Sequence, residues 1–174
     1  IDIKKRREVK WVVPIALGDS HRGYRVVGTS KEYFKKFKYR RNIPLTFTTG
    51  NKFSDLFDTV LGADVARSLN YKIGDKIVLA HGTGPVSIGK DHGDTPFRVS
   101  GILEYTGTPV DRAVHVSMEA IEAIHIGWET GAFSDQDNKK SPENLRKLDL
   151  RPKAVTALYV GLKSRMSTFS LQRW

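Results

Sequence analysis

Apolar and polar positions are patterned most clearly between residues 60 and 116. An apolar stripe at helical spacing predicts a short amphipathic helix over Gly62–Leu69 that ends near Asn70; its members are Leu61, Val65 and Leu69. Gly74-Asp75 then predicts a turn, because glycine adopts backbone angles that a β-carbon forbids. The β-branched and apolar residues of Lys76–Ala80 predict a strand after this turn.

A second strand is predicted over Phe97–Leu103, where residues alternate with a period of two. One face would carry Phe97, Val99, Gly101 and Leu103, and the other Arg98, Ser100 and Ile102. This alternation is typical of a half-buried strand in an antiparallel sheet. Thr108-Pro109 breaks the pattern, and Ala113–Val116 resumes it.

The N-terminal part predicts two strands joined by a loop. Lys10–Leu17 is apolar but contains Pro14, which lacks the donor that a central strand position needs, so we expect an edge or bulged strand. Gly18–Gly23 would be the hairpin loop, and Tyr24–Gly28 the returning strand.

A helix is predicted to follow over Lys31–Phe37. Thr29 and Glu32, three residues apart, form the pattern of a capping box at its start. Phe34 and Phe37 lie at helical spacing and would face inward.

The C-terminal part predicts a helix from Ser141-Pro142-Glu143, because it offers a capping hydroxyl, a first-turn proline and a carboxylate near the positive end of the helix dipole. Leu145 and Leu148 would be its apolar face, and Pro152 would stop it. Val155–Leu162 alternates as a strand, which we expect to pair with the first two strands. A last helix would begin near Met166.

Size and composition restrict the class of protein. The 174 residues, 39% of them hydrophobic, suffice for one sizeable core or two small ones. The net charge of +10 indicates an anionic neighbour such as nucleic acid, a lipid surface or an acidic partner. There is no cysteine, which excludes disulfides and thiolate zinc sites. No run approaches the ~18 apolar residues of a spanning helix.

The order of these segments resembles the MacB-like periplasmic core domain of FtsX-type ABC transporter permeases. The resemblance lies in VLGADVARSL, the Gly-Asp turn into a strand, FRVSGIL, and TGTPVDRAVHVS. It extends upstream to RVVGTSKEYFKKF and downstream to KAVTALYVGLKS, and so covers most of the chain. In that family the domain lies between the first two transmembrane helices, so we expect this chain, which starts without Met, to be a fragment of a longer protein.

The resemblance implies an α+β fold with two lobes, a mixed or antiparallel sheet and short helices. Residues 1–58 and 153–174 would form the first lobe of a single extracytoplasmic domain. Residues 59–152 would form the second lobe, inserted between them.

A phosphate-binding loop is the sharpest catalytic alternative. Gly84–Lys90 has the glycine and lysine spacing of such a loop, but Asp91 replaces the hydroxyl that would hold magnesium. Asp91–Pro96 also cannot continue as the required helix. A flexible hairpin loop is the simpler interpretation.

A divalent metal site would need ligands from the same glycine-rich loop. These would be His81, Asp91, His92 and Asp94, which no helix or strand fixes in place. His21 beside Asp19, and His115 in a strand, have less support, since a lone strand histidine is most often a satisfied structural residue. Without a cysteine, a GxSxG elbow or a matched carboxylate pair, we assign no catalytic, cofactor-binding or metal-binding residue.

Two basic segments raise the alternative of a single-strand nucleic-acid-binding module. Lys4–Arg7 reads KKRR, and Phe34–Arg41 interleaves aromatic and cationic residues as a base-stacking surface would. In the simpler interpretation, Phe34 and Phe37 are buried and the lysines are the solvated side. No RNP, helix-turn-helix or GXXG pattern supports nucleic-acid binding.

The resemblance implies a non-catalytic periplasmic part of a permease that needs no cofactor. Its expected partners are an ABC ATPase, a second permease copy and outer partner proteins, with no nucleic acid among them. The domain would act mechanically, coupling cytoplasmic ATP hydrolysis to export or release of a substrate on the far side of the membrane.

Overall fold

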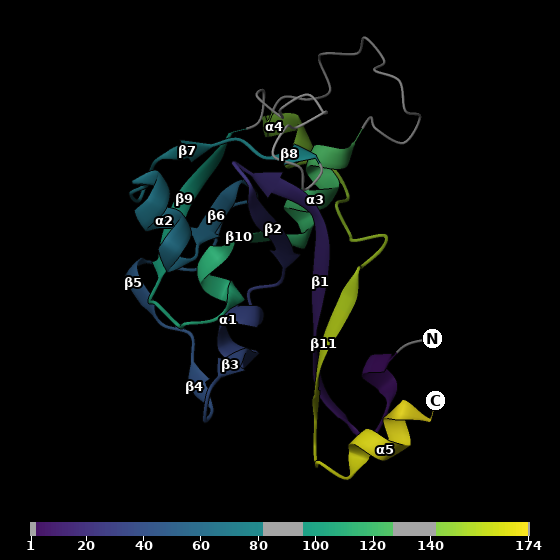
Figure 1. Cartoon of the computed structure of the whole chain (residues 1–174). Coiled ribbons are helices and arrows are strands. Elements are labelled where there is room, and N and C mark those ends of the chain that lie inside the picture. Colours follow the sequence, from purple (N-terminus) through teal and green to yellow (C-terminus); the bar gives the residue numbers. More distant parts are fainter. Residues whose placement is uncertain (1–2, 82–95, 127–141, 174) are drawn as a thin grey trace.

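The computed structural model describes residues 3–81, 96–126 and 142–173, and its main feature is one large mixed β-sheet (Figure 1). The strands are β1 (Val9–His21), β2 (Tyr24–Thr29), β3 (Lys38–Tyr39), β4 (Ile43–Pro44), β5 (Phe47–Gly50), β6 (Asp58–Leu61), β7 (Lys76–Ile77), β8 (Ala80–His81), β9 (Phe97–Leu103), β10 (Ala113–Ser117) and β11 (Ala157–Leu162). The sheet runs in the order β11-β1-β2-β10-β6-β9-β5, with β7 beside β9 and β8 beside β1. Strands β3 and β4 pair separately.

The helices are short. They are the 3-10 turns η1 (Ile3–Lys5) and η2 (Pro109–Arg112) and the α-helices α1 (Tyr33–Lys36), α2 (Ala63–Leu69), α3 (Met118–His125), α4 (Pro142–Leu145) and α5 (Ser167–Gln172). None of the helices in the described part of the chain is long and apolar enough to cross a membrane. The α+β fold class is confirmed.

The side chains of the sheet contribute to two hydrophobic clusters. The larger, here the first core cluster, contains α2 and α3 residues such as Val65 and Ile121 together with Val114 and Val116 of β10. The second core cluster includes Phe34 of α1 and Val60. Neighbouring residues enter different clusters because successive side chains of a strand point to opposite faces.

The predicted helix and turn after residue 61 are confirmed. α2 begins behind Gly62, and Asn70 ends it in a left-handed conformation with φ of 55°. Gly74 has φ of 93°, and its N–H donates to the Val99 carbonyl at 2.8 Å. The single strand predicted over Lys76–Ala80 is wrong, because β7 pairs with β9 whereas β8 pairs with β1.

Strand β9 has the predicted bounds and alternating burial. Its neighbours are not all antiparallel, since β6 runs parallel to it. The predicted common face is wrong at its end: Phe97 and Val99 belong to the first core cluster, and Leu103 to the second. The register between β6 and β9 shifts near residue 100, and such an irregularity turns the following side chains over.

Strand β1 departs most from its prediction. It continues to His21, so the predicted loop shrinks to a turn at Arg22 and Gly23, which both have positive φ. β1 is not an edge strand, because β11 and β2 flank it. Its irregularities lie at residues 9–11 and 17–20, away from Pro14.

The capping box predicted for α1 is wrong. The Thr29 hydroxyl donates to the Pro14 carbonyl at 2.9 Å, which ties β2 to β1 instead of capping a helix. α1 begins only at Tyr33, with Glu32 at its N-cap and no side-chain cap. Phe34 is buried as predicted, and Phe37 is half-buried.

The C-terminal elements lie near their predicted positions. β11 pairs antiparallel with β1 but not with β2, because β2 occupies the other edge of β1. α4 ends at Leu145, which is buried, so the prediction that Leu148 shares its apolar face is wrong: Leu148 lies beyond the helix and is 47% exposed. α5 begins one residue after Met166.

The division into two lobes stays a prediction. Strand β10, from the segment assigned to the inserted lobe, pairs in parallel with β2, from the flanking segment. The same sheet thus contains strands of both segments.

Candidate functional site

A two-stranded ribbon extends from the body of the molecule, and both ends of the described chain lie at its far end (Figure 1). We call this part the arm: the first half of β1, residues 9–15, paired with β11, together with η1 and α5. Val13 opposite Tyr159 and Ile15 opposite Ala157 are among its paired residues.

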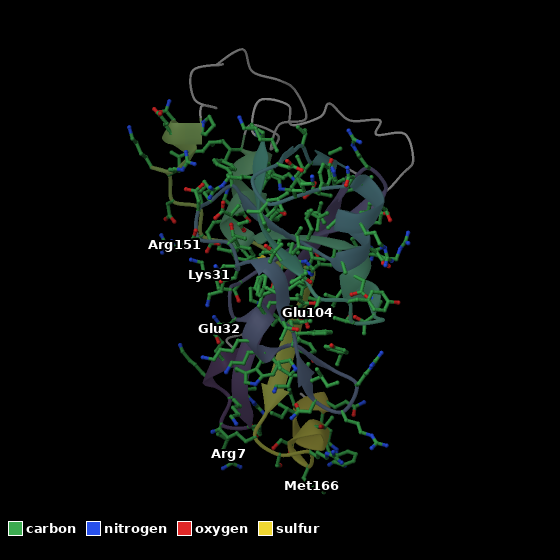
Figure 2. All side chains as sticks on the ribbon, turned by 90° about the vertical axis from the view of Figure 1, so that its left-hand side faces the viewer. Arg7, Lys31, Glu32, Glu104, Arg151 and Met166 are labelled. Atoms are coloured by element: carbon green, nitrogen blue, oxygen red, sulfur yellow. The ribbon has the colours of Figure 1, made fainter. Side chains whose placement is uncertain are left out.

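The far end of the arm combines positive charge with exposed apolar side chains. Arg7 and Met166 lie at this end in Figure 2. The Arg7 side chain is 94% exposed, and Met166 and Phe169 are 72% and 61% exposed. The predicted basic segment Lys4–Arg7 is therefore part of the arm, next to α5.

A chain of aromatic contacts connects the arm with the large sheet. The ring centroid of Trp11 lies 5.3 Å from that of Tyr159, which lies 5.7 Å from Phe37 of α1. Phe37 contacts Tyr33 at 5.2 Å, and Tyr33 contacts His115 of β10 at 5.4 Å. A continuous row of packed rings therefore runs from β11 to the centre of the sheet.

Gly161 fixes where Trp11 lies in this row. A β-carbon at residue 161 would overlap the Trp11 indole, so only glycine lets the ring lie directly on the β11 backbone. Sequence reasoning missed this pair because it joins residues 150 positions apart.

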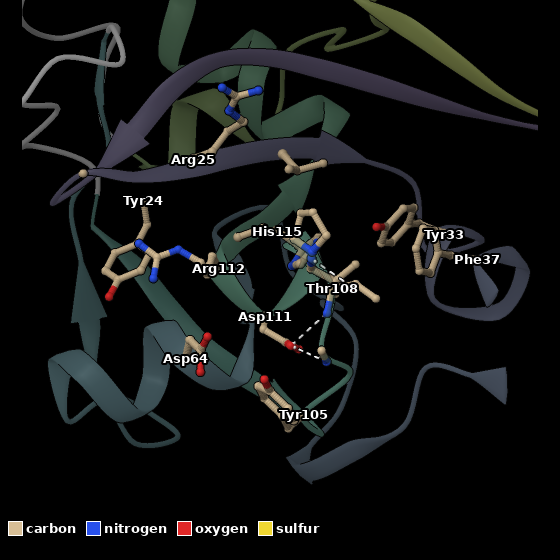
Figure 3. A pocket seen from close by; sticks show the side chains of 16 residues that line it. Tyr24, Arg25, Tyr33, Phe37, Asp64, Tyr105, Thr108, Asp111, Arg112 and His115 are labelled. Carbon is tan, nitrogen blue, oxygen red and sulfur yellow. Dashed lines mark hydrogen bonds between the residues drawn. The ribbon is translucent and has the colours of Figure 1, made fainter. Parts of the chain in front are cut away.

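A pocket of about 800 Å³ opens where the aromatic row meets the sheet (Figure 3). Residues of β2, α1, β10 and the loop before β10 line it, among them Tyr24, Arg25, Tyr33, Phe37, Tyr105, Pro109, Arg112 and His115. Tyr24 and Arg112 lie on one side of His115 in Figure 3, and Tyr33 and Phe37 on the other.

Asp111 shapes the loop that forms one wall of this pocket. Its buried carboxylate accepts hydrogen bonds from the backbone N–H groups of Thr106, Gly107 and Thr108 at 2.8, 2.7 and 3.2 Å, and from the Thr106 hydroxyl at 2.8 Å. With Thr108 it forms a capping box for η2. The segment TGTPVDR is thus a loop organised by one carboxylate, which the strand pattern alone showed only as an interruption.

His115 lies at the floor of the pocket and is fully buried. Its Nδ1 donates to the Val60 carbonyl at 3.2 Å, whereas its Nε2 has no hydrogen-bond partner within the described ranges. Burial lowers the pKa of His115 to about 4, so the ring is neutral at pH 7. We expected a structural histidine with both ring nitrogens hydrogen-bonded. Within the described ranges this holds for Nδ1 but not for Nε2.

His21 has a structural role. Its Nδ1 lies 2.7 Å from the Val78 carbonyl and its Nε2 2.9 Å from the Tyr71 hydroxyl, which ties the end of β1 to the segment after α2. The neighbouring Asp19 contacts His125 of α3 instead, with 3.6 Å between Oδ1 and Nε2. Hydrogen bonding to Asp19 outweighs burial and raises the pKa of His125.

The other predicted alternatives fall largely on residues that are not described. Gly84–Lys90, Asp91, His92 and Asp94 lie outside the described residues, and of His81 only the backbone is placed, in β8. Within the described ranges no three histidines or carboxylates are close enough to hold a metal ion. The absence of nucleotide and metal sites therefore stays a prediction.

The nucleic-acid alternative gains no support. Phe34 is buried in the second core cluster and Phe37 packs against it, so neither ring is free to stack on a base. The lysines between them lie outside the core, as the simpler interpretation predicted.

Comparison with protein families gives a match over residues 1–168 to the MacB-like periplasmic core domain. The chain belongs to this family. A comparison with curated proteins found no match.

Comparison with solved structures gives a similar fold. The extracellular domain of the noncanonical ABC-type transporter YknZ from Gram-positive bacteria is 14% identical, with a TM-score of 0.53 over 96% of this chain and 72% of that one. This likeness shows a shared fold. Also similar are a domain of a putative permease from Porphyromonas gingivalis (11% identity, TM-score 0.49, 98% and 69% coverage) and the periplasmic region of MacB from Actinobacillus actinomycetemcomitans (12%, 0.45, 99% and 80%).

Proposed function

We propose that this MacB-like domain is the non-catalytic extracytoplasmic part of an ABC transporter permease, and that it couples cytoplasmic ATP hydrolysis to export or release of a substrate. The family match over residues 1–168 carries the proposal. The partners would be the ATPase and a second copy of the permease.

The arm supports a mechanical role. It brings both ends of the described chain to one place, away from the body of the sheet, so a movement applied at that place reaches the body through two paired strands (Figure 1). Transmission by rigid-body motion requires stiff elements more than reactive side chains. The aromatic row from Trp11 to His115 supplies packed contacts along this route.

The location is tested with a single cysteine. Ser68 of α2 is exposed, and the chain has no cysteine of its own, so Ser68→Cys in the full-length permease gives one label site in this domain. In intact cells a membrane-impermeant maleimide should modify it without lysis. Labelling only after lysis would place the domain in the cytoplasm and contradict the proposal.

The coupling is tested with a spin label at the same cysteine in the permease–ATPase complex. Trapping the ATP-bound state should change the distance between labels on the two copies. Gly161→Val, which displaces Trp11 in the arm, should reduce this change while nucleotide binding stays normal. Ala157→Val adds the same side chain at an exposed position of β11 and serves as the control. If the distance between the two labels in the wild-type domain did not change when ATP binds, coupling through this domain would be refuted.

A further inference from the structure

We propose that the pocket between β2, α1 and η2 binds a small amphipathic anion: a molecule with an apolar ring or chain body and one acidic group. This inference rests on the pocket itself and does not depend on the transporter assignment. No sequence motif had marked the residues of this pocket as ligand-binding.

The walls of the pocket are suited to an apolar body. Tyr33, Phe37, Tyr105 and Pro109 contribute aromatic and aliphatic surface, and the volume of about 800 Å³ lies in the range of small-molecule sites. Tyr105 is 62% exposed, although it is a large aromatic residue beside a cavity. A peptide strand would need a longer groove than this one cavity.

The charge at the pocket is positive because its carboxylates are already engaged. The Asp111 carboxylate accepts hydrogen bonds from backbone N–H groups of its loop, and Asp64 forms an ion pair with Arg67. Arg25 and Arg112 are exposed, and neither has a carboxylate partner in the described part of the chain. The Arg112 guanidinium lies 5.3 Å from the centre of the Tyr24 ring, which holds it at the pocket. Two arginines without counter-ions favour an acidic group.

A matched pair of fluorescent probes tests this chemistry. 1-Anilinonaphthalene-8-sulfonate has two apolar ring systems, a naphthalene and a phenyl ring, and one acidic group, and N-phenyl-1-naphthylamine is the same molecule without the sulfonate. Titrated into the intact chain, the sulfonate probe should bind saturably at one site. The uncharged probe should bind about a hundredfold more weakly, as expected for the loss of one charge-assisted contact with each of the two arginines.

Exposed-residue variants identify the site without risk to folding. Arg25→Ala and Arg112→Ala should each weaken the sulfonate probe about tenfold and leave the uncharged probe unchanged. Arg41→Ala, an exposed arginine outside the pocket, should change neither. Equal binding of the sulfonate probe to all three variants would overturn the proposal and show adventitious binding only.

Backbone NMR locates the site independently. Backbone amides around residues 24–27 and 107–115 should shift when the sulfonate probe binds. Probe-induced shifts confined to the far end of the arm would overturn the assignment.

Discussion

At the residue scale, two buried carboxylates organise loops of this structure. Asp58 is almost fully buried in β6, and its Oδ2 accepts hydrogen bonds at 3.0 Å from the backbone N–H of Ser54, the Ser54 hydroxyl and the backbone N–H of Asp55. Its Oδ1 accepts from Arg98 of β9 at 2.9 Å. Asp111 has the same role in the loop before β10. In each case one carboxylate accepts hydrogen bonds from loop N–H groups, which in a helix or sheet would donate to backbone carbonyls.

Asp58 predicts a pH dependence of stability. Burial raises the pKa of Asp58, but the backbone N–H groups of Asp55 and Ser54 and the contact with Arg98 outweigh it, so the pKa is lowered overall. A lowered folded-state pKa adds stability above the usual aspartate pKa of about 4, and this stability is lost as the pH falls through the folded-state value.

Asp58→Asn should therefore lower the unfolding free energy at pH 7 by about 1 to 3 kcal/mol. The difference from the wild type, measured by urea denaturation, should shrink between pH 5 and pH 2. Asp149→Asn, which removes an exposed carboxylate paired with Arg151, is the control and should have little effect at either pH. A difference that is independent of pH would contradict the ionised role of Asp58.

Gly74 provides a second prediction at this scale. Its φ of 93° suits glycine, and a β-carbon added there would meet no atom within 4 Å, so backbone strain alone opposes Gly74→Val. The variant should lose about 1 to 3 kcal/mol of stability and melt several degrees lower. Asp75→Asn should cost much less, because an amide oxygen can still accept the Lys72 N–H, now 2.8 Å from Oδ2. Similar losses in both variants would mean that the turn depends on charge and not on φ.

At the element scale, the arm should open more readily than the rest of the sheet. β11 is an edge strand whose first three residues are exposed, whereas every residue of β10, at the centre, is buried. Local opening requires little energy where few apolar side chains are buried. Amides of β11 should therefore exchange with solvent faster than those of β10.

Gly161→Val should enlarge this contrast. By displacing Trp11 from β11, it should speed amide exchange in peptides covering residues 9–15 and 157–162, while peptides covering β9 and β10 keep their protection. Hydrogen exchange read by mass spectrometry measures both regions in one experiment, with Ala157→Val as the matched control. Faster exchange throughout the sheet would show that the arm is not a separate element.

At the scale of the whole molecule, the shared sheet determines cooperativity. β2 and β10 come from the two predicted lobes and pair over five residues, from Ala113 with Arg25 to Ser117 with Thr29. Separating the lobes would break this pairing and expose the central strand. We therefore expect a single calorimetric unfolding transition whose calorimetric and van't Hoff enthalpies agree. Two transitions would indicate two lobes that fold independently.

The sequence by itself determined the elements in which local pattern and local turn chemistry agree. α2, the Gly74 turn and β9 were predicted with nearly correct bounds because their apolar spacing, a left-handed cap and glycine all act within a few residues. The order of the same segments also identified the family. The residues that stabilise these elements lie close together in the sequence.

Only the tertiary structure decided the features that depend on partners far along the chain. β1 could extend to His21 because β2 and β8 pair with its second half, and Thr29 bonds to Pro14 instead of capping α1. The pocket and the arm likewise join residues such as Trp11 with Gly161, or Tyr33 with His115, whose types carry no local signal. Pairing across long sequence separations is set by the packing of the whole sheet, and no short window of residues contains that information.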